Sequence, residues 1–99
     1  MSTLEQLRGY VAFVGVDGLS IETGLTASDI DSAYVQRAII QNARQVVLMA
    51  DHSKFENPSL FKIMDLSVIS TVVTDISPTS EWSEFFASND IQIICPQNA

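Results

Sequence analysis

The chain has 99 residues, which is enough for one domain with a single hydrophobic core and too few for two. Hydrophobic residues make up 46% of it, a share that excludes an intrinsically disordered chain. The formal net charge of −7 disfavours direct binding to nucleic acids or anionic membranes, because an acidic surface repels phosphate groups.

The first half of the chain predicts a strand, a loop and a helix, in that order. Residues 10–16 (YVAFVGV) are rich in β-branched and aromatic residues and end before Asp17 and Gly18, a turn signal. The next residues, up to Thr26, contain two glycines and polar spacing, which is typical of a loop. A helix is then expected to begin at Thr26, because residues 26–29 (TASD) have the form of a capping box.

This helix carries an apolar stripe and leads almost directly into a second strand. The stripe at helical spacing comprises Ile30, Tyr34, Val35, Ala38, Ile39 and Ala43. Residues 45–51 (QVVLMAD) do not alternate apolar with polar, which indicates a strand covered on both faces, as in a parallel sheet. A helix that joins two such strands forms a βαβ unit, which we expect to be right-handed.

The second half predicts two further strands and one further helix. Residues 60–66 (LFKIMDL) fit either a short strand or an apolar connection, whereas residues 70–76 (STVVTDI) and 91–96 (IQIICP) indicate strands. Between these strands, Ser77 followed by Pro78 predicts the start of a helix. The order of elements predicts an α/β fold, a layered domain of βαβ units with a parallel sheet.

Three predicted strands end at an aspartate, and these are Asp17, Asp51 and Asp75. In an open parallel sheet, ligands bind outside the carboxyl ends of the strands. Lys54 follows the second strand, so its ammonium group is expected at this edge, where it can bind a phosphate or a sugar hydroxyl or pair with an aspartate. Spacing alone leaves a structural and a ligand role equally open for Asp51 and Lys54. Asp75, just before the second helix, is expected to be structural.

Other polar and aromatic residues favour structural roles. His52 has no second histidine or cysteine nearby, so we expect a loop histidine and no metal site. Cys95 is the only cysteine, which excludes an internal disulfide and indicates an inert core thiol. Trp82 and the adjacent Phe85 and Phe86 are expected to be core. P-loop, GxGxxG and GxSxG motifs are absent, and we expect no cofactor.

The hydropathy pattern gives no sign of a membrane protein. No run of about 18 or more apolar residues is present. Residues 1–10 (MSTLEQLRGY) lack the basic, apolar and small-residue order of a signal peptide. With a single cysteine, this composition predicts a cytoplasmic protein.

Four marks in order resemble the effector-sensing domain of DeoR-type bacterial transcription regulators. They are a strand that ends in VDG (16–18), GLT (24–26) just before a helix, the block ADHSKF (50–55) and a late TD strand (74–75). The similar region covers roughly residues 10–95. The resemblance implies the fold of ribose-5-phosphate isomerase and its relatives, a Rossmann-like layered sheet.

The same resemblance implies a function and a set of site residues. Sensor domains of this family bind phosphorylated sugars or related metabolites and thereby alter the grip of an attached helix-turn-helix domain on DNA. Carried over by position, the ligand-binding residues are Asp17, Gly18, Gly24, Thr26, Asp51 and Lys54. Lys54 would donate a charge-assisted hydrogen bond to the sugar phosphate.

This sequence also departs from the family pattern. It shows no winged helix-turn-helix and no Gly/Thr-rich phosphate loops, so residues 1–99 are expected to be one sensor-domain fragment without a DNA-binding domain. We expect no catalysis, and DNA contact only through a helix-turn-helix absent from this chain. One alternative is a remnant of a sugar-phosphate isomerase with Glu22 or Asp17 as base. Another is a dimerisation module, in which a second copy covers an open sheet edge or apolar face.

Overall fold

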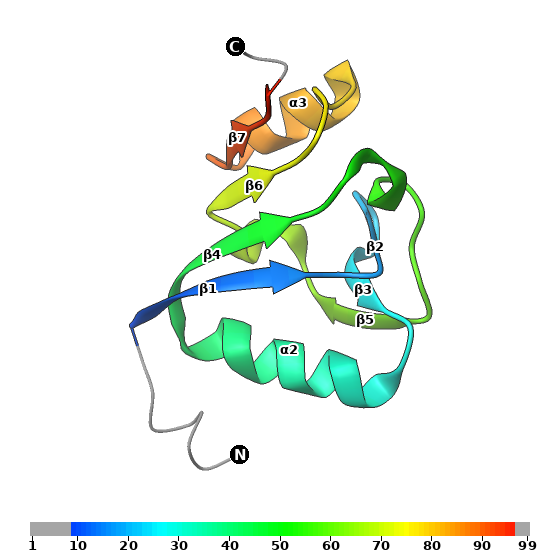
Figure 1. Ribbon diagram of the computed structural model, residues 1–99, viewed down its shortest axis with the longest axis vertical. Coiled ribbons are helices and arrows are strands. Elements are labelled where there is room, and N and C mark those ends of the chain that lie inside the picture. Colours follow the sequence, from blue (N-terminus) through cyan, green and yellow to red (C-terminus); the bar gives the residue numbers. More distant parts are fainter. Residues whose placement is uncertain (1–8, 97–99) are drawn as a thin grey trace.

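The computed structural model describes residues 9–96, which form a parallel four-stranded sheet beside a smaller antiparallel one (Figure 1). The parallel sheet has the order β1-β4-β6-β7. Its strands are β1 (Tyr10–Gly15), β4 (Ala43–Met49), β6 (Thr71–Val73) and β7 (Gln92–Ile94). This layout confirms the predicted α/β fold with a parallel sheet.

Two helices connect the parallel strands. Helix α2 (Ile30–Asn42) joins β1 to β4 by way of the small sheet, and helix α3 (Ser80–Ser88) joins β6 to β7. Two single turns of 3₁₀ helix, η1 (His52–Lys54) and η2 (Leu66–Val68), lie between β4 and β6. No helix in the described residues is long and apolar enough to cross a membrane. The prediction about a signal peptide concerns residues 1–10, most of which lie outside the described range.

The antiparallel sheet was not predicted as such. It contains β2 (Gly18–Ser20), β3 (Gly24–Ala27) and β5 (Phe61–Met64) in the order β2-β3-β5. The sequence predicted a loop for the first two strands and left the third open. Every residue of β2 and β3 is buried, so neither strand has the alternation of apolar and polar residues that marks a half-exposed strand.

Both helices begin later than the sequence predicted. The N-cap of α2 is Asp29, whose carboxylate accepts hydrogen bonds from the backbone N–H (2.8 Å) and hydroxyl (3.0 Å) of Ser32. These bonds lower the pKa of Asp29, with the backbone bond as the largest cause. Thr26 instead belongs to β3, where its hydroxyl bonds across the small sheet. Helix α3 follows Thr79 rather than Ser77.

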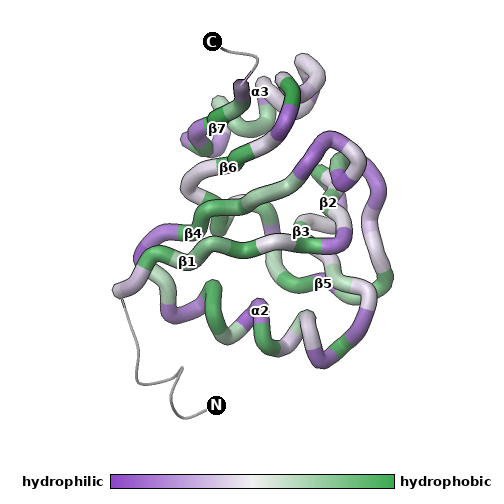
Figure 2. The backbone as a smooth tube through the Cα atoms, in the orientation of Figure 1, coloured by the Kyte–Doolittle hydropathy of each residue, from purple (hydrophilic) through white to green (hydrophobic). Residues whose placement is uncertain are grey.

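One face of the parallel sheet covers the core. Val14, Leu48 and Val72 lie side by side on this face and are buried against α2, the small sheet and α3. Trp82 and Phe86 of α3 are buried in the same core, as predicted, and the ring of Trp82 packs against Phe55 with centroids 4.9 Å apart. Figure 2 shows the hydrophobic residues concentrated along the sheet strands.

The opposite face of the parallel sheet is uncovered in the described residues. Phe13 is 67% exposed and Met49 is 51% exposed, and both alternate with buried neighbours. The sequence predicted that residues 45–51 form a strand covered by other elements on both faces of the sheet. Successive right-handed crossovers that advance in one direction put every connection on the same face, which explains why the described part leaves this face bare.

The apolar stripe of α2 is also largely turned outward. Tyr34 is 63% exposed, and Ile30 and Val35 are exposed as well. Ala33 and Ile40 are the helix residues that are buried. The helix therefore packs through small and aliphatic side chains on one side and presents a second apolar strip to its surroundings.

Candidate functional site

The loops that follow β1 and β4 lie against each other at the carboxyl ends of the parallel strands. Leu19 forms a parallel bridge with Phe55, and a Cβ on Gly18 would lie only 2.0 Å from the carbonyl oxygen of Asn57. Lys54 directly precedes Phe55, and Asp17 lies two residues before Leu19. The structure therefore brings these two segments to the same edge, as the parallel topology predicted.

Asp17 is exposed and uses one carboxylate oxygen within the protein. Its Oδ2 accepts a hydrogen bond of 2.7 Å from the backbone N–H of Ser28, and its own N–H donates to the carbonyl of Thr26 at 3.1 Å. These bonds fix the turn between β3 and α2 beside the end of β1. Oδ1 has no hydrogen bond described within residues 9–96 and is available to a donor.

Gly24 and Thr26 have packing roles in the small sheet. Gly24 has φ +87°, and a Cβ there would lie 2.5 Å from the carbonyl oxygen of Met64. The buried hydroxyl of Thr26 donates to the carbonyl of Gly18 at 2.7 Å and accepts from the N–H of Ser59 at 2.8 Å. A ligand role for these residues remains a prediction.

Asp51 and Lys54 belong to the single turn η1. The carboxylate of Asp51 accepts hydrogen bonds from the hydroxyl and the backbone N–H of Ser53, the latter at 3.0 Å. The pKa of Asp51 is lowered mainly by the Ser53 hydroxyl and to a smaller extent by the Lys54 charge. Ion pairs in the described residues are His52–Asp75 and Lys62–Asp65, so the half-buried Lys54 takes part in neither.

His52 and Asp75 form a contact that the sequence analysis did not anticipate. The ring Nδ1 of His52 lies 2.8 Å from Asp75 Oδ2, and its backbone N–H donates to Oδ1 at 2.8 Å. The bond from His52 is the largest cause that lowers the pKa of Asp75 to about 2. The same bond raises the pKa of His52. The signal in the sequence is that both residues follow the ends of two strands that prove to be neighbours.

Asp75 also holds its own loop. Its Oδ1 accepts from the N–H of Ile76 at 3.1 Å and from the hydroxyl of Thr74 at 3.3 Å, which agrees with the structural role expected for it. Cys95 is buried, with its sulfur 3.5 Å from the hydroxyl of Ser77. Within residues 9–96, no group of three or more histidine, cysteine or acidic side chains is placed to hold a metal ion.

Comparison with known proteins shows which family the chain resembles. Residues 1–76 match the family model described as the DeoR C terminal sensor domain. The chain is 34% identical over 87 residues to a putative sgc region transcriptional regulator of Escherichia coli K12, and 32% identical over 96 residues to the HTH-type transcriptional repressor GlcR of Bacillus subtilis 168. It is 29% identical over 90 residues to the glycerol-3-phosphate regulon repressor of Escherichia coli K12.

These matches cover most of this chain but a minor part of each relative. They include 88%, 94% and 91% of the chain, and 34%, 37% and 36% of the three relatives, respectively. The chain thus spans about a third of the length of the curated relatives that it matches. The matched family model covers three strands of the parallel sheet and the loops that carry Asp17, Asp51 and Lys54. The chain belongs to the DeoR family of transcriptional regulators, and its residues 1–76 correspond to the sensor domain of that family.

Proposed function

We propose that this chain is the ligand-sensing part of a DeoR-type regulator and that it binds a phosphorylated sugar or a related metabolite without catalysis. The observation that carries the proposal is Lys54. It is half-buried at the carboxyl edge of the sheet and takes part in neither of the ion pairs described within residues 9–96. A partly desolvated ammonium group without a fixed carboxylate partner favours an anionic guest.

The surrounding groups suit the rest of such a ligand. Asp51 is an exposed carboxylate whose pKa is lowered mainly by the Ser53 hydroxyl, and Asp17 has a carboxylate oxygen free of described bonds. Both are acceptors for sugar hydroxyls, while Lys54 is a donor for the phosphate. One relative is named as the repressor of a glycerol-3-phosphate regulon. We therefore include phosphorylated polyols among the ligands proposed for this chain.

The position of Glu22, one of the two candidate bases, does not favour catalysis. Glu22 lies in the turn between β2 and β3, at the opposite end of this hairpin from Asp17. It is exposed, and no hydrogen bond or ion pair orients it within the described residues. A general base for isomerisation needs a fixed position within hydrogen-bond reach of its substrate.

The proposal includes DNA as an indirect partner. Several relatives are HTH-type transcriptional regulators, and they extend well beyond the region that this chain matches. The acidic composition of this chain makes the sensor itself a poor surface for DNA phosphates. We therefore assign DNA contact to a helix-turn-helix that lies outside the matched region.

A thermal-shift comparison of two lysine variants tests the site. Glucose 6-phosphate and glycerol 3-phosphate are expected to raise the Tm of the wild-type chain. The variant Lys54→Ala should weaken binding about tenfold or more, because hydrogen bonds to charged groups contribute about 1.5–3 kcal/mol. The control is Lys62→Ala. Lys62 lies on β5, pairs with Asp65 at 2.6 Å and should not contact the ligand.

Three results would contradict this proposal. An unchanged ligand-induced shift in Lys54→Ala would remove Lys54 from the site. No shift with any phosphorylated sugar would remove sensing by this chain. Turnover of ribose 5-phosphate would instead favour the isomerase alternative.

Dimerisation is a second candidate, and the bare face of the parallel sheet favours it. Phe13, Met49 and Ile94 are all exposed on this face, and β1 lies at an edge of the described sheet. A second copy would bury the apolar face, and this role is compatible with ligand sensing at the carboxyl edge of the strands.

A further inference from the structure

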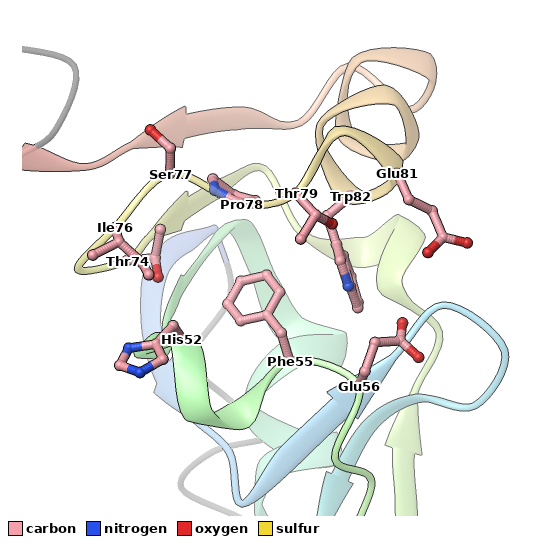
Figure 3. Close-up of a pocket in the computed structure, with 10 residues that line it drawn as sticks. All are labelled: His52, Phe55, Glu56, Thr74, Ile76, Ser77, Pro78, Thr79, Glu81 and Trp82. Atoms are coloured by element: carbon pink, nitrogen blue, oxygen red, sulfur yellow. The ribbon is translucent and has the colours of Figure 1, made fainter.

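A cavity of about 420 Å³ lies between the loop after β4 and the segment that leads from β6 into α3 (Figure 3). Both lining segments follow the carboxyl ends of neighbouring parallel strands, the edge at which α/β sheets bind ligands. Its volume is in the range of small-molecule pockets. Lys54 and Asp17 do not line it, so it is distinct from the site proposed above.

The cavity has an apolar wall that includes two aromatic rings. Phe55 and Trp82 meet edge to face at an interplanar angle of 81°, and Ile76 and Pro78 extend the apolar surface. Figure 3 shows the indole of Trp82 reaching down from α3 between Phe55 and the side chains of Glu56 and Glu81. An aromatic wall of this kind suits the C–H faces of a compact ring.

Trp82 also has an unsatisfied hydrogen-bond donor. The residue is 2% exposed. Among the buried side-chain nitrogen and oxygen atoms of residues 9–96, Trp82 Nε1 is the one that has no hydrogen-bond partner. Buried indole N–H groups usually have a partner, and an unpaired one lowers stability. Because Nε1 has almost no exposed surface, a ligand acceptor would reach it through a small displacement of the neighbouring side chains.

The polar groups around the cavity include two carboxylates. Glu56 and Glu81 are exposed, and neither takes part in an ion pair within residues 9–96. Thr79 is the N-cap of α3, but its hydroxyl makes no capping bond. No lysine or arginine is among the described residues that line the cavity. Two unpaired carboxylates therefore repel a phosphate and accept hydrogen bonds from hydroxyl groups.

His52 lines the cavity as well, and Figure 3 shows it on the other side of Phe55 from the glutamates. Its Nδ1 is engaged by Asp75 at 2.8 Å, so only the second ring nitrogen is free to contact a ligand. Its partner Asp75 is itself a carboxylate, so the surroundings of the cavity are acidic on this side as well.

We propose that this cavity binds an uncharged polyhydroxylated ring, such as a free sugar or a cyclic polyol. The C–H face of the ring packs on Phe55 and the neighbouring apolar side chains. Its hydroxyl groups donate to Glu56 and Glu81, and one of its oxygens accepts from Trp82 Nε1. This binding does not depend on the phosphate-binding role of Lys54.

Intrinsic fluorescence tests the proposal directly, because Trp82 is the only tryptophan of the chain. We expect D-glucose or myo-inositol to change its emission in a saturable manner. The variant Glu81→Ala should weaken this binding about tenfold, the effect of losing a hydrogen bond to a charged group. The matched control is Glu84→Ala on the same helix, which does not line the cavity and should leave the affinity unchanged.

A second variant tests the indole donor. Trp82→Phe keeps an aromatic ring but removes the N–H, and calorimetry should show binding that is weaker by about two- to tenfold. If this variant does not fold, Glu81→Ala still decides the question. An absence of saturable change with both neutral probes, or equal affinity in Glu81→Ala and wild type, would overturn the proposal.

The same titrations in a Lys54→Ala background separate the two sites. Neutral probes should bind this variant as they bind the wild type, whatever the outcome for phosphorylated ligands. In this background, glucose 6-phosphate should bind more weakly than glucose, because its phosphate meets the two carboxylates. Tighter binding of the phosphate ester there would overturn the assignment of an uncharged ligand.

Discussion

His52 and Asp75 tie the loop after β4 to the loop after β6 by two hydrogen bonds of 2.8 Å. The pKa of Asp75 falls from 3.8 to about 2, so its stabilising contribution is present above pH 4 and is lost as the pH falls towards 2. The pKa of His52 rises above 6.5, so its contribution is complete below that pH and is lost as the pH rises through the folded-state value. The pair therefore stabilises the fold most between about pH 4 and pH 6.5.

The variant Asp75→Asn should return the pKa of His52 towards 6.5, because the carboxylate that holds the imidazolium is removed. His52 is the only histidine, so an NMR titration of its ring protons reads this pKa without assignment. Asp51→Asn is the control, since the charge of Asp51 is a smaller cause of the shift and its removal should lower the pKa less. A His52 pKa that is the same in Asp75→Asn and wild type would show that the pair does not form in solution.

The strands of the parallel sheet were predictable from the sequence, whereas those of the small sheet were not. Strands β1, β6 and β7 lie within apolar, β-branched runs that stand out locally, and β4 overlaps such a run but begins two residues earlier, at Ala43, which was predicted to belong to the helix. The strands of the small sheet have three or four residues, and the partner of Leu25 in β5 is Met64, far away along the chain. Its formation depends on tertiary contacts that no short window of sequence contains.

Part of the candidate site was likewise predictable from the sequence, and part was not. A parallel sheet requires that Asp17, Asp51 and Lys54 share one edge, so their common location followed from the predicted topology. The bonds of Thr26 to Gly18 and Ser59 join three separate segments and could not be read from spacing. The pairing of His52 with Asp75 likewise depends on β4 and β6 being neighbours, which the order of elements alone does not specify.

A glycine substitution tests the junction between β3 and β5. Gly24→Ala should lower the free energy of unfolding by about 2 kcal/mol or more, because φ is +87° and the new Cβ would lie 2.5 Å from a backbone oxygen. Gly15→Ala in β1 is the control, since its nearest neighbour would be the Met49 carbonyl oxygen at 4.0 Å. It should change stability by less than about 1 kcal/mol in urea unfolding followed by circular dichroism. Equal losses in the two variants would contradict the close approach of β3 to β5.

At the scale of the whole fold, the parallel sheet has one covered and one bare face within residues 9–96. Helix α2, the small sheet and α3 all pack into a single core on one face of the parallel sheet. The bare face continues around the β1 edge, because Phe13 of this face and Val35 and Ile39 of α2 line one shallow groove. Exposed apolar side chains gathered on one face are typical of an interaction site.

We expect this chain to associate with itself through the bare face. Sedimentation velocity should show a concentration-dependent dimer, and Phe13→Glu should weaken it at least about tenfold, since a charge cannot be buried there without a partner. Phe13 is already 67% exposed, so the variant should keep the native circular dichroism. Leu60→Glu is the control, because Leu60 is 79% exposed but lies in the loop before β5. A monomer at every concentration would exclude the dimer. Equal weakening by Leu60→Glu would indicate non-specific hydrophobic contact, because Phe13 belongs to the bare face of the sheet and Leu60 does not.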